Sequence, residues 1–272
     1  MRYLKLMLCL LVTLVTIDTR AQTPDAGLQA IDSVFSYESF IRQGDTLRYR
    51  MLTPLHHDIH KQYPLVIFLH GAGERGSDNK AQLKHGGKWL GSDSLREKFP
   101  AYVLFPQCPV NETWAPMKVR FDSAGKRMSF EFPLDAPPTK PGGMLKPLID
   151  SLVASGKVDP KRIYIGGLSL GGMGTFYMIT KYPDLFAAAF PICGSGNAAA
   201  AANFAKKVPV WIFHGGADPV VPVQASREYD QKLKSLGAEY KYTEYPGVGH
   251  DSWNNVFVEP GVLEWLFEHK KQ

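Results

Sequence analysis

Residues 162–175 read RIYIGGLSLGGMGT. The first four form a short, largely apolar run that predicts a buried strand, and a helical pattern begins at Gly171. Between them, Ser169 stands in the pattern Gly-x-Ser-x-Gly, flanked by Gly167 and Gly171. In a strand–turn–helix setting this pattern predicts a sharp turn that pushes the serine hydroxyl out above a sheet. A glycine-rich structural turn is the alternative, and the flanking strand and helix argue against it.

Short apolar runs of the same kind recur along the chain. Without polar alternation, such runs are typical of strands in a parallel sheet whose two faces are both covered. Further strands are expected at 65–69, 101–105, 187–192, 208–213 and 240–245. Helical spacing is found at 145–152, 171–181, 222–236 and 262–269. The alternation predicts one α/β domain with a doubly wound, mostly parallel sheet and helices on both faces.

Two segments depart from this alternation. Near the start, 35–42 and 46–52 flank the turn residues Gln43-Gly44-Asp45, which predicts an antiparallel N-terminal hairpin. Residues 106–141 are rich in proline and aromatic side chains and fit neither element. We therefore expect a long excursion there, lying over the mouth of a site.

The first residues have the layout of a secretory signal peptide. Two basic residues precede an apolar run at 6–17, and Thr19-Arg20-Ala21 offers a cleavage site before Gln22. The run is too short to span a bilayer comfortably, and no later segment is long and apolar enough to do so. A buried N-terminal helix or an anchor is the alternative. We expect export to a periplasm or to the exterior, without stable membrane insertion.

This leader sets the expected domain organisation. A signal peptide is expected at 1–21, a linker at 22–34 and the α/β domain at 35–272. Basic and acidic residues number 31 and 26 and are scattered, so no basic stripe suggests a nucleic-acid partner. Cys108 and Cys193 remain after cleavage; a bridge between them is permitted, and two separate buried thiols are favoured.

Ser169 needs a base, because a serine hydroxyl is a weak nucleophile until its proton is removed. His250 lies in a glycine loop after the last expected strand, where a Ser–Asp–His chain order places the base. His70 and His214 each end a buried strand before a glycine, so we interpret them as structural or loop-shaping residues.

A second group of histidines raises the question of a metal. His56, His57 and His60 lie close together, but Asp58 is the single carboxylate among them. Their loop offers no further carboxylate to support a metal site. We therefore predict no metal and no cofactor.

The base needs an acceptor that holds its tautomer and stabilises the imidazolium. Asp218 follows the strand at 208–213 and lies between nucleophile and base in chain order. Asp251 is adjacent to His250, where the two side chains rarely point at each other, and Asp184 lies beyond the far end of the helix after Ser169. Asp218 is therefore favoured.

The oxyanion of an acyl-transfer reaction needs donors directed at it. The backbone N–H of Leu170, directly after the serine, is one candidate. The second is expected in HGAGERG at 70–76, with the amide of Ala72 favoured and that of Gly73 next. In the same loop, Glu74 and Arg75 could touch substrate, but a salt bridge that stiffens the loop is favoured.

Two tryptophans are candidates for substrate binding. Trp114 lies in the excursion, beyond the carboxyl end of a strand, and Trp253 follows His250 by three residues. Aromatic faces near a shallow site suit sugar rings or aromatic acyl groups. Packing of the excursion onto the domain is the alternative.

With these residues in place, the chain resembles the α/β-hydrolase superfamily. Within it, the sequence is most similar to bacterial carboxylesterases related to feruloyl and acetylxylan esterases and to dienelactone-hydrolase-like proteins. The resemblance covers about 36–266 and is carried by HGAGERG at 70–76, PQCP at 106–109, GGLSLGGMGT at 166–175, PICG at 191–194, HGGADPVVP at 214–222 and GHDSW at 249–253.

The resemblance implies an α/β-hydrolase fold, a Ser169–Asp218–His250 triad, oxyanion donors at Ala72 and Leu170, an ester substrate and no cofactor. The expected substrate is a small-molecule or carbohydrate ester, such as an acetyl or feruloyl ester on a plant-type poly- or oligosaccharide. A prolyl-oligopeptidase-type peptidase would share the triad order, but this chain has no room for the large second domain of such enzymes. A catalytically silent binding protein would have lost a triad member. The oligomeric state is left open.

Overall fold

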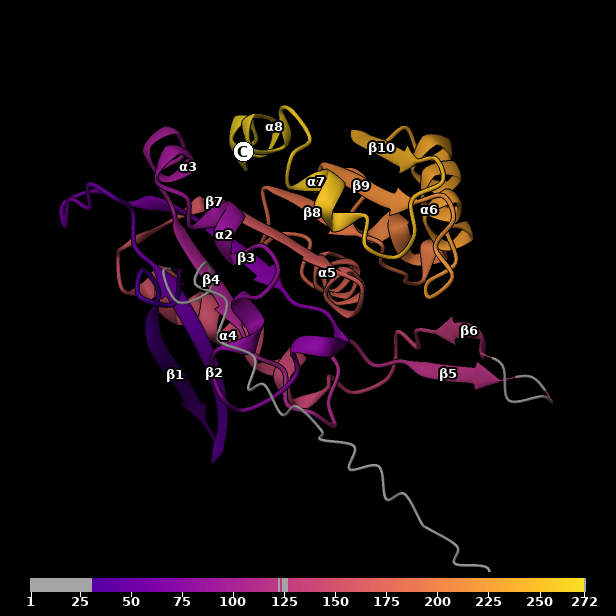
Figure 1. The fold of residues 1–272 in the computed structure, drawn as a ribbon, viewed down its shortest axis with the longest axis horizontal. Helices are drawn as coiled ribbons and strands as arrows, with labels where there is room; N and C mark the ends of the chain where they lie inside the picture. The colour runs from indigo at the N-terminus through magenta and orange to yellow at the C-terminus, as the bar shows by residue number, and fades with distance from the viewer. Residues whose placement is uncertain (1–30, 122, 124–126, 272) are drawn as a thin grey trace, which may run out of the picture.

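The computed structural model describes residues 31–121, 123 and 127–271 (Figure 1). The expected signal peptide and most of the expected linker lie outside the described residues. The strands are β1 (Ser36–Arg42), β2 (Asp45–Leu52), β3 (Tyr63–Leu69), β4 (Tyr102–Pro106), β5 (Lys118–Phe121), β6 (Arg127–Glu131), β7 (Val158–Leu168), β8 (Ala188–Ile192), β9 (Val210–Gly215) and β10 (Tyr240–Tyr245). The α-helices are α2 (Gly87–Leu90), α3 (Asp93–Lys98), α4 (Lys140–Ala154), α5 (Leu170–Lys181), α6 (Gln224–Ser235), α7 (Trp253–Val256) and α8 (Val262–Glu268). Three 3₁₀ helices are η1 (Ala72–Glu74), η2 (Ala81–Leu83) and η3 (Ala198–Asn203).

Eight of these strands form one twisted sheet in the order β1-β2-β4-β3-β7-β8-β9-β10. β1 and β2 form the expected antiparallel hairpin, whose turn places Gln43 and Gly44 at positive φ. β2 also pairs antiparallel with β4, and from β4 to β10 all neighbours are parallel. The predicted α/β-hydrolase fold, with its mostly parallel sheet and N-terminal hairpin, is confirmed.

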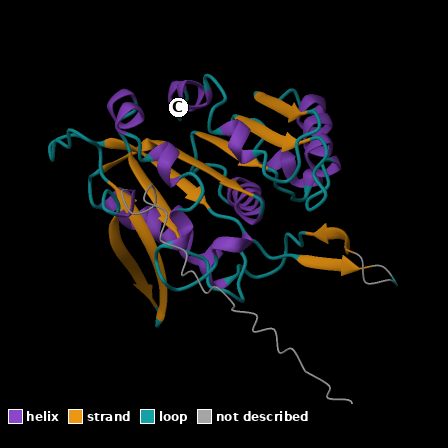
Figure 2. Ribbon diagram, viewed as in Figure 1, coloured by secondary structure: helices purple, strands orange, loops and turns teal. Residues whose placement is uncertain are grey.

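The core lies on both faces of the sheet, as the apolar runs predict. In β3, Leu65, Ile67 and Leu69 face one cluster, whereas Val66 and Phe68 face the other. Apolar residues of α4, α5 and α6 complete the first cluster, and those of α2, α7 and α8 complete the second. Figure 2 shows these helices in purple around the orange strands. No helix of the described part is long and apolar enough to cross a bilayer.

The direction of winding changes between β3 and β7. β3 and β7 are parallel neighbours, β4 lies beyond β3, and β8 lies beyond β7. In such sheets, ligands bind outside the carboxyl ends of the strands at this switch point. The loop after β3 and the turn after β7 meet there, so the topology brings HGAGERG beside Ser169.

The excursion at 106–141 contains a feature that the sequence analysis missed. β5 and β6 form a two-stranded antiparallel hairpin that projects from the body of the molecule (Figure 1). All four residues of β5 are exposed, and its alternation of polar and apolar residues, Lys118-Val119-Arg120-Phe121, covers only four positions, the lower limit for indicating a strand. Phe130 and Phe132 pack against the first core cluster and join the hairpin to the domain.

Candidate active site

Ser169 occupies the one-residue turn between β7 and α5. Its φ is 54° and its ψ is −115°, a backbone conformation that is strained for a residue with a side chain. A Cβ at Gly167 would lie 2.5 Å from the carbonyl oxygen of Leu69, and one at Gly171 would lie 1.8 Å from the same oxygen. The glycines of the motif are therefore required because the turn passes directly over the end of β3.

The turn brings together the three residues expected to form the triad. His250 Nε2 lies 2.9 Å from Ser169 Oγ, and His250 Nδ1 lies 2.7 Å from Asp218 Oδ2. Ionised Asp218 only accepts, so Nδ1 carries the proton and Nε2 is free to accept from the serine hydroxyl. Ser169, Asp218 and His250 follow β7, β9 and β10, so three strand ends position them.

The two other aspartates considered for the acid lie elsewhere. Asp251 is exposed and accepts a hydrogen bond from Asn254. Asp184 forms an ion pair with Lys207, with 2.8 Å between Nζ and Oδ1. Neither carboxylate is bonded to His250 in this structure.

The side chain of Asp218 is fully buried, yet its surroundings favour the charged form. Oδ1 accepts from the amides of Val220 and Val221, at 2.8 and 2.9 Å. Oδ2 faces His250 and also His214, whose Nε2 is 3.2 Å away. Burial opposes ionisation, but these hydrogen bonds outweigh it and hold the pKa of Asp218 well below its usual range.

The expected oxyanion donors lie on the two loops that meet at the switch point. Leu170 is the first residue of α5 and Ala72 the first of η1, and amides at a helix start have no partner within the helix. A Cβ at Gly71 would lie 2.8 Å from Leu168 Cδ1, so the loop after β3 is in close contact with the end of β7. The roles of Ala72 and Leu170 stay predictions.

Glu74 and Arg75 do not pair with each other. Glu74 is buried, and its Oε1 lies 3.5 Å from His85 Nε2. Arg75 instead donates to the carbonyl oxygens of Ala72 and Glu112. Both side chains therefore hold the loop in place. They do so through His85, Ala72 and Glu112, and not through a salt bridge with each other.

The expectation that Trp114 binds substrate is wrong for this structure. Its side chain is fully buried, and its indole N–H donates to the carbonyl oxygen of His70, at 3.1 Å. The indole also packs edge-on against the ring of His70 and contacts Gly174. Because the ring is covered and its donor is used, Trp114 fixes the excursion to the end of β3.

Trp253 lies beside the base. Its ring is perpendicular to that of His250, with 5.6 Å between centroids, and 5.1 Å from the ring of His85. The side chain is partly exposed. This position is compatible with contact to a substrate, which stays a prediction.

His70 orders the loop after β3. Its Nδ1 lies 2.6 Å from the carbonyl oxygen of Gly71, and its Nε2 accepts from the amide of Cys108, at 3.0 Å. Burial lowers the pKa of His70 to about 4, so the ring is neutral at ordinary pH. The neutral ring joins the oxyanion loop to the start of the excursion.

The histidines considered for a metal do not converge. His56 contacts Glu97, and His57 Nε2 lies 2.5 Å from the hydroxyl of Tyr102. Within the described residues, the grouping with metal-ligand spacing is Cys193, Asp218 and His250. Two of these are the triad residues already bonded to each other.

The two cysteines are separate free thiols. Cys108 and Cys193 are both buried. Burial raises the pKa of Cys108 to about 12, which keeps this thiol protonated.

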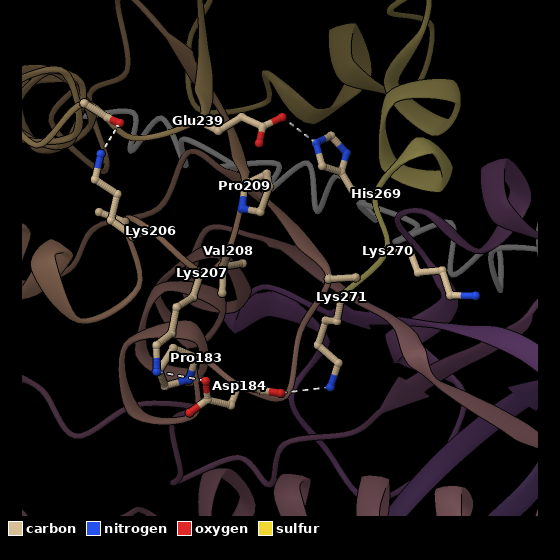
Figure 3. Close-up of a pocket in the computed structure, with 13 residues that line it drawn as sticks. Pro183, Asp184, Lys206, Lys207, Val208, Pro209, Glu239, His269, Lys270 and Lys271 are labelled. Carbon is tan, nitrogen blue, oxygen red and sulfur yellow. Dashed lines mark hydrogen bonds and ion pairs between the residues drawn. The ribbon is translucent and has the colours of Figure 1, made fainter.

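A cavity of about 650 Å³ lies at the opposite edge of the sheet (Figure 3). Its lining includes residues that precede β8, β9 and β10, at the amino ends of these strands. Its charged groups are engaged in part with one another, as in the pairs Lys207–Asp184 and His269–Glu239. This cavity is remote from Ser169 and is not part of the candidate active site.

Carboxylesterases and acyl-protein thioesterases are among the proteins that this chain is similar to. The chain is 29% identical over 219 residues to a probable carboxylesterase of Oryza sativa subsp. japonica, covering 76% of this chain and 77% of that protein. It is 30% identical over 200 residues to acyl-protein thioesterase 1 of Neurospora crassa, covering 69% of this chain and 80% of that protein. The solved structure of a thermostable esterase is 37% identical, with a TM-score of 0.79, and covers 89% of this chain; the chain spans 64% of that esterase.

The profile of one family covers most of the domain. The phospholipase/carboxylesterase family matches residues 55–259, which include the serine turn, Asp218 and His250. The chain therefore belongs to the phospholipase/carboxylesterase family of α/β hydrolases and is a serine ester hydrolase.

Proposed function

We propose that this chain is an exported serine carboxylesterase that works through an acyl-enzyme, with Ser169 as nucleophile, His250 as base and Asp218 as acid. The observation that carries the proposal is the continuous contact from Ser169 Oγ through the His250 ring to Asp218 Oδ2, at 2.9 and 2.7 Å. We also propose that, within the family, it is related to the bacterial carboxylesterases that its sequence resembles.

Each step of the reaction uses a group already in position. As Ser169 Oγ attacks the ester carbonyl carbon, its proton passes to His250 Nε2, and the amides of Ala72 and Leu170 receive the oxyanion. Collapse of this intermediate breaks the bond to the alcohol, which takes the proton from His250. Water then attacks the acyl carbonyl carbon and gives a proton to His250. The bond to Ser169 Oγ breaks, Oγ takes the proton from His250, and the carboxylic acid leaves.

The acyl group that we propose is acetyl. The support is the similarity to an acetylxylan esterase/xylanase, given below. A small cavity beside α5, lined by Met173 and by Phe132 of the excursion, has no triad residue in its lining, so its size does not bear on the acyl group.

The proposed alcohol is a plant-type poly- or oligosaccharide. Trp253 supports it, because a partly exposed indole beside the base suits stacking against a sugar ring. A bifunctional acetylxylan esterase/xylanase of Neocallimastix patriciarum is 31% identical over 86 residues, covering 32% of this chain. The burial of Trp114 leaves Trp253 as the aromatic contact of this proposal.

Activity assays test the proposal directly. Wild type should hydrolyse p-nitrophenyl acetate and acetylated xylo-oligosaccharides faster than methyl ferulate, and should leave a peptidyl p-nitroanilide intact. A fluorophosphonate probe should label wild type at Ser169 but not Ser169→Ala. Cleavage of the anilide would favour a peptidase. A folded wild type that neither reacts with the probe nor cleaves any ester would indicate a silent binding protein.

Export is tested separately. The support for it is the layout of residues 1–21. When the full chain is produced in a bacterial host, the mass of the mature protein should correspond to a start at Gln22. Recovery of the complete chain from the cell interior would contradict export and leave the esterase assignment intact.

A further inference from the structure

We infer that His214 is a positioning residue for the catalytic acid, and that Ser226 and His214 extend the hydrogen-bonded chain of the triad inward. The inference rests on the proposed function of Asp218. From the sequence, His214 is expected to be structural or loop-shaping, because it stands at the end of the expected strand 208–213 and before a glycine. Its ring nitrogens, however, contact groups that act on Asp218.

The chain runs through fully buried side chains. Ser226 Oγ, in the first turn of α6, lies 2.7 Å from His214 Nδ1. His214 Nε2 lies 3.0 Å from the carbonyl oxygen of Val221 and 3.2 Å from Asp218 Oδ2. Both Ser226 and His214 are 0% exposed, so water cannot replace either partner.

The chemistry of the partners fixes the protons along this chain. A carbonyl oxygen and a carboxylate only accept, so His214 Nε2 must carry a proton and share it between Val221 and Asp218. In the neutral ring, Nδ1 then accepts, and its partner Ser226 donates. Ser226 thereby selects the tautomer of His214 that can donate to the acid.

This arrangement determines where the lone pairs of Asp218 point. Oδ1 is held by the amides of Val220 and Val221, and Oδ2 receives one imidazole N–H from each side, His214 and His250. Without His214, Asp218 Oδ2 would have His250 as its single donor. The negative charge of the carboxylate would then interact more strongly with His250. The imidazolium of His250 would then be stabilised before the reaction, and the ring would be a poorer acceptor near neutral pH.

Two ionisable neighbours of this chain do not titrate in the range of an assay. Burial raises the pKa of Cys193 far above neutral, with the charges of Asp218 and Asp251 acting in the same direction. Hydrogen bonds from Arg227 and Tyr242 lower the pKa of Glu244, beside His214 on the next strand, to about 2. Asp251 and His85, which also lie near His250, are kept in every variant, so a difference in the acid limb of the pH profile between variants reports on the substitution at His214.

The test uses two substitutions of nearly equal size. His214→Gln keeps a side-chain N–H close to the position of Nε2, whereas His214→Met fills similar space without a donor. In His214→Met, kcat/KM for p-nitrophenyl acetate should fall about tenfold, the effect of one lost hydrogen bond to a charged group, and its acid limb should move to higher pH. His214→Gln should recover most of the rate with the limb close to that of wild type. Ser226→Ala should lower kcat/KM less than His214→Met does and should move the acid limb in the same direction.

Each outcome distinguishes the inference from a packing role and from the proposed function. Equal losses in the Gln and Met variants, with the acid limb unchanged and the melting temperatures lowered alike, would overturn the inference. A wild-type rate in a folded His214→Met would also overturn it. If wild type itself hydrolyses no ester and Ser169 does not react with the fluorophosphonate probe, the proposed function fails first.

Discussion

The indole N–H of Trp114 donates to the carbonyl oxygen of His70, 3.1 Å away, and so fixes the excursion to the end of β3. The contact lies inside the core, at the first residue of the loop that carries the expected oxyanion donor Ala72. A mutation at Trp114 is therefore expected to act on stability and on the position of this loop, not on recognition of one substrate.

Trp114→Phe should lower the free energy of unfolding by about 1–3 kcal/mol, because it leaves the buried carbonyl of His70 without its donor and shrinks the side chain. Denaturant unfolding measures the loss. Values of kcat/KM on p-nitrophenyl acetate and on an acetylated oligosaccharide should fall by the same factor. A selective loss on the oligosaccharide would restore Trp114 as a binding residue.

Gly171→Ala should prevent folding or remove more than about 3 kcal/mol of stability, because its Cβ would overlap the carbonyl oxygen of Leu69. Gly44→Ala is the matched control. Gly44 has a φ of 85° with open space around it, so alanine there costs about 1 kcal/mol of backbone strain alone. Thermal melts of the two variants should differ widely, and similar melting temperatures would contradict the close approach of α5 to β3.

Acid should destabilise the protein in a window set by His70. Its pKa is about 4 in the folded protein and about 6.5 in an unfolded chain, so between these values only the unfolded chain binds the proton. The free energy of unfolding should fall as the pH drops from about 6.5 to about 4, by roughly 3 kcal/mol from this residue.

His70→Gln removes the titrating group and is the control for that window. Its absolute stability should be lower at pH 7, but its slope between pH 6.5 and 4 should be shallower than that of wild type. Asp218 affects the stability at lower pH. Because its pKa is lowered in the folded protein, its contribution to the free energy of unfolding is lost only below about pH 4. Equal slopes in wild type and His70→Gln would show that His70 is not held neutral.

Asp218→Asn should reduce kcat by about four orders of magnitude, because an amide can donate to His250 and select the wrong tautomer. Asp184→Asn is the control, since Asp184 lies near the opposite edge of the sheet, paired with Lys207. The control should keep the wild-type rate on p-nitrophenyl acetate. A large loss in Asp184→Asn with near-normal activity in Asp218→Asn would reverse the assignment of the acid.

Trp253→Phe should raise KM for acetylated xylo-oligosaccharides more than for p-nitrophenyl acetate, because a smaller ring offers less surface to a sugar. The comparison must include kcat, since Trp253 also packs against His250. An equal change in KM on both substrates would limit Trp253 to supporting the base.

The sequence could predict the central strands and the triad positions, because each has a local cause. Apolar runs such as 65–69 predict strands covered on both faces, and the glycines around Ser169 reflect a steric requirement of the turn. The chain order of Asp218 and His250 follows from the order of the strands that precede them. These signals need no knowledge of contacts between distant residues.

The missed features depend on such distant contacts. β5 and β6 do alternate polar and apolar residues, but over only four and five positions, in a segment whose prolines indicate an irregular chain. The burial of Trp114 depends on how the excursion folds back over Gly174. The sequence of the excursion alone does not reveal this contact. The role of His214 depends on the path of the loop between Asp218 and Val221. This path places the carboxylate of Asp218 and the carbonyl oxygen of Val221 near the same nitrogen, His214 Nε2.

The triad is supported unevenly, and this has a consequence for heat inactivation. Ser169 is held between central strands, with its amide bonded to Ile192 of β8 and its glycines against β3. His250 lies in a loop beyond β10, the last strand of the sheet, which pairs with β9 alone among the described strands. On gradual warming, the base should lose its place before the nucleophile does. Hydrolysis should therefore decline at a lower temperature than the unfolding of the sheet, and brief cooling should restore it.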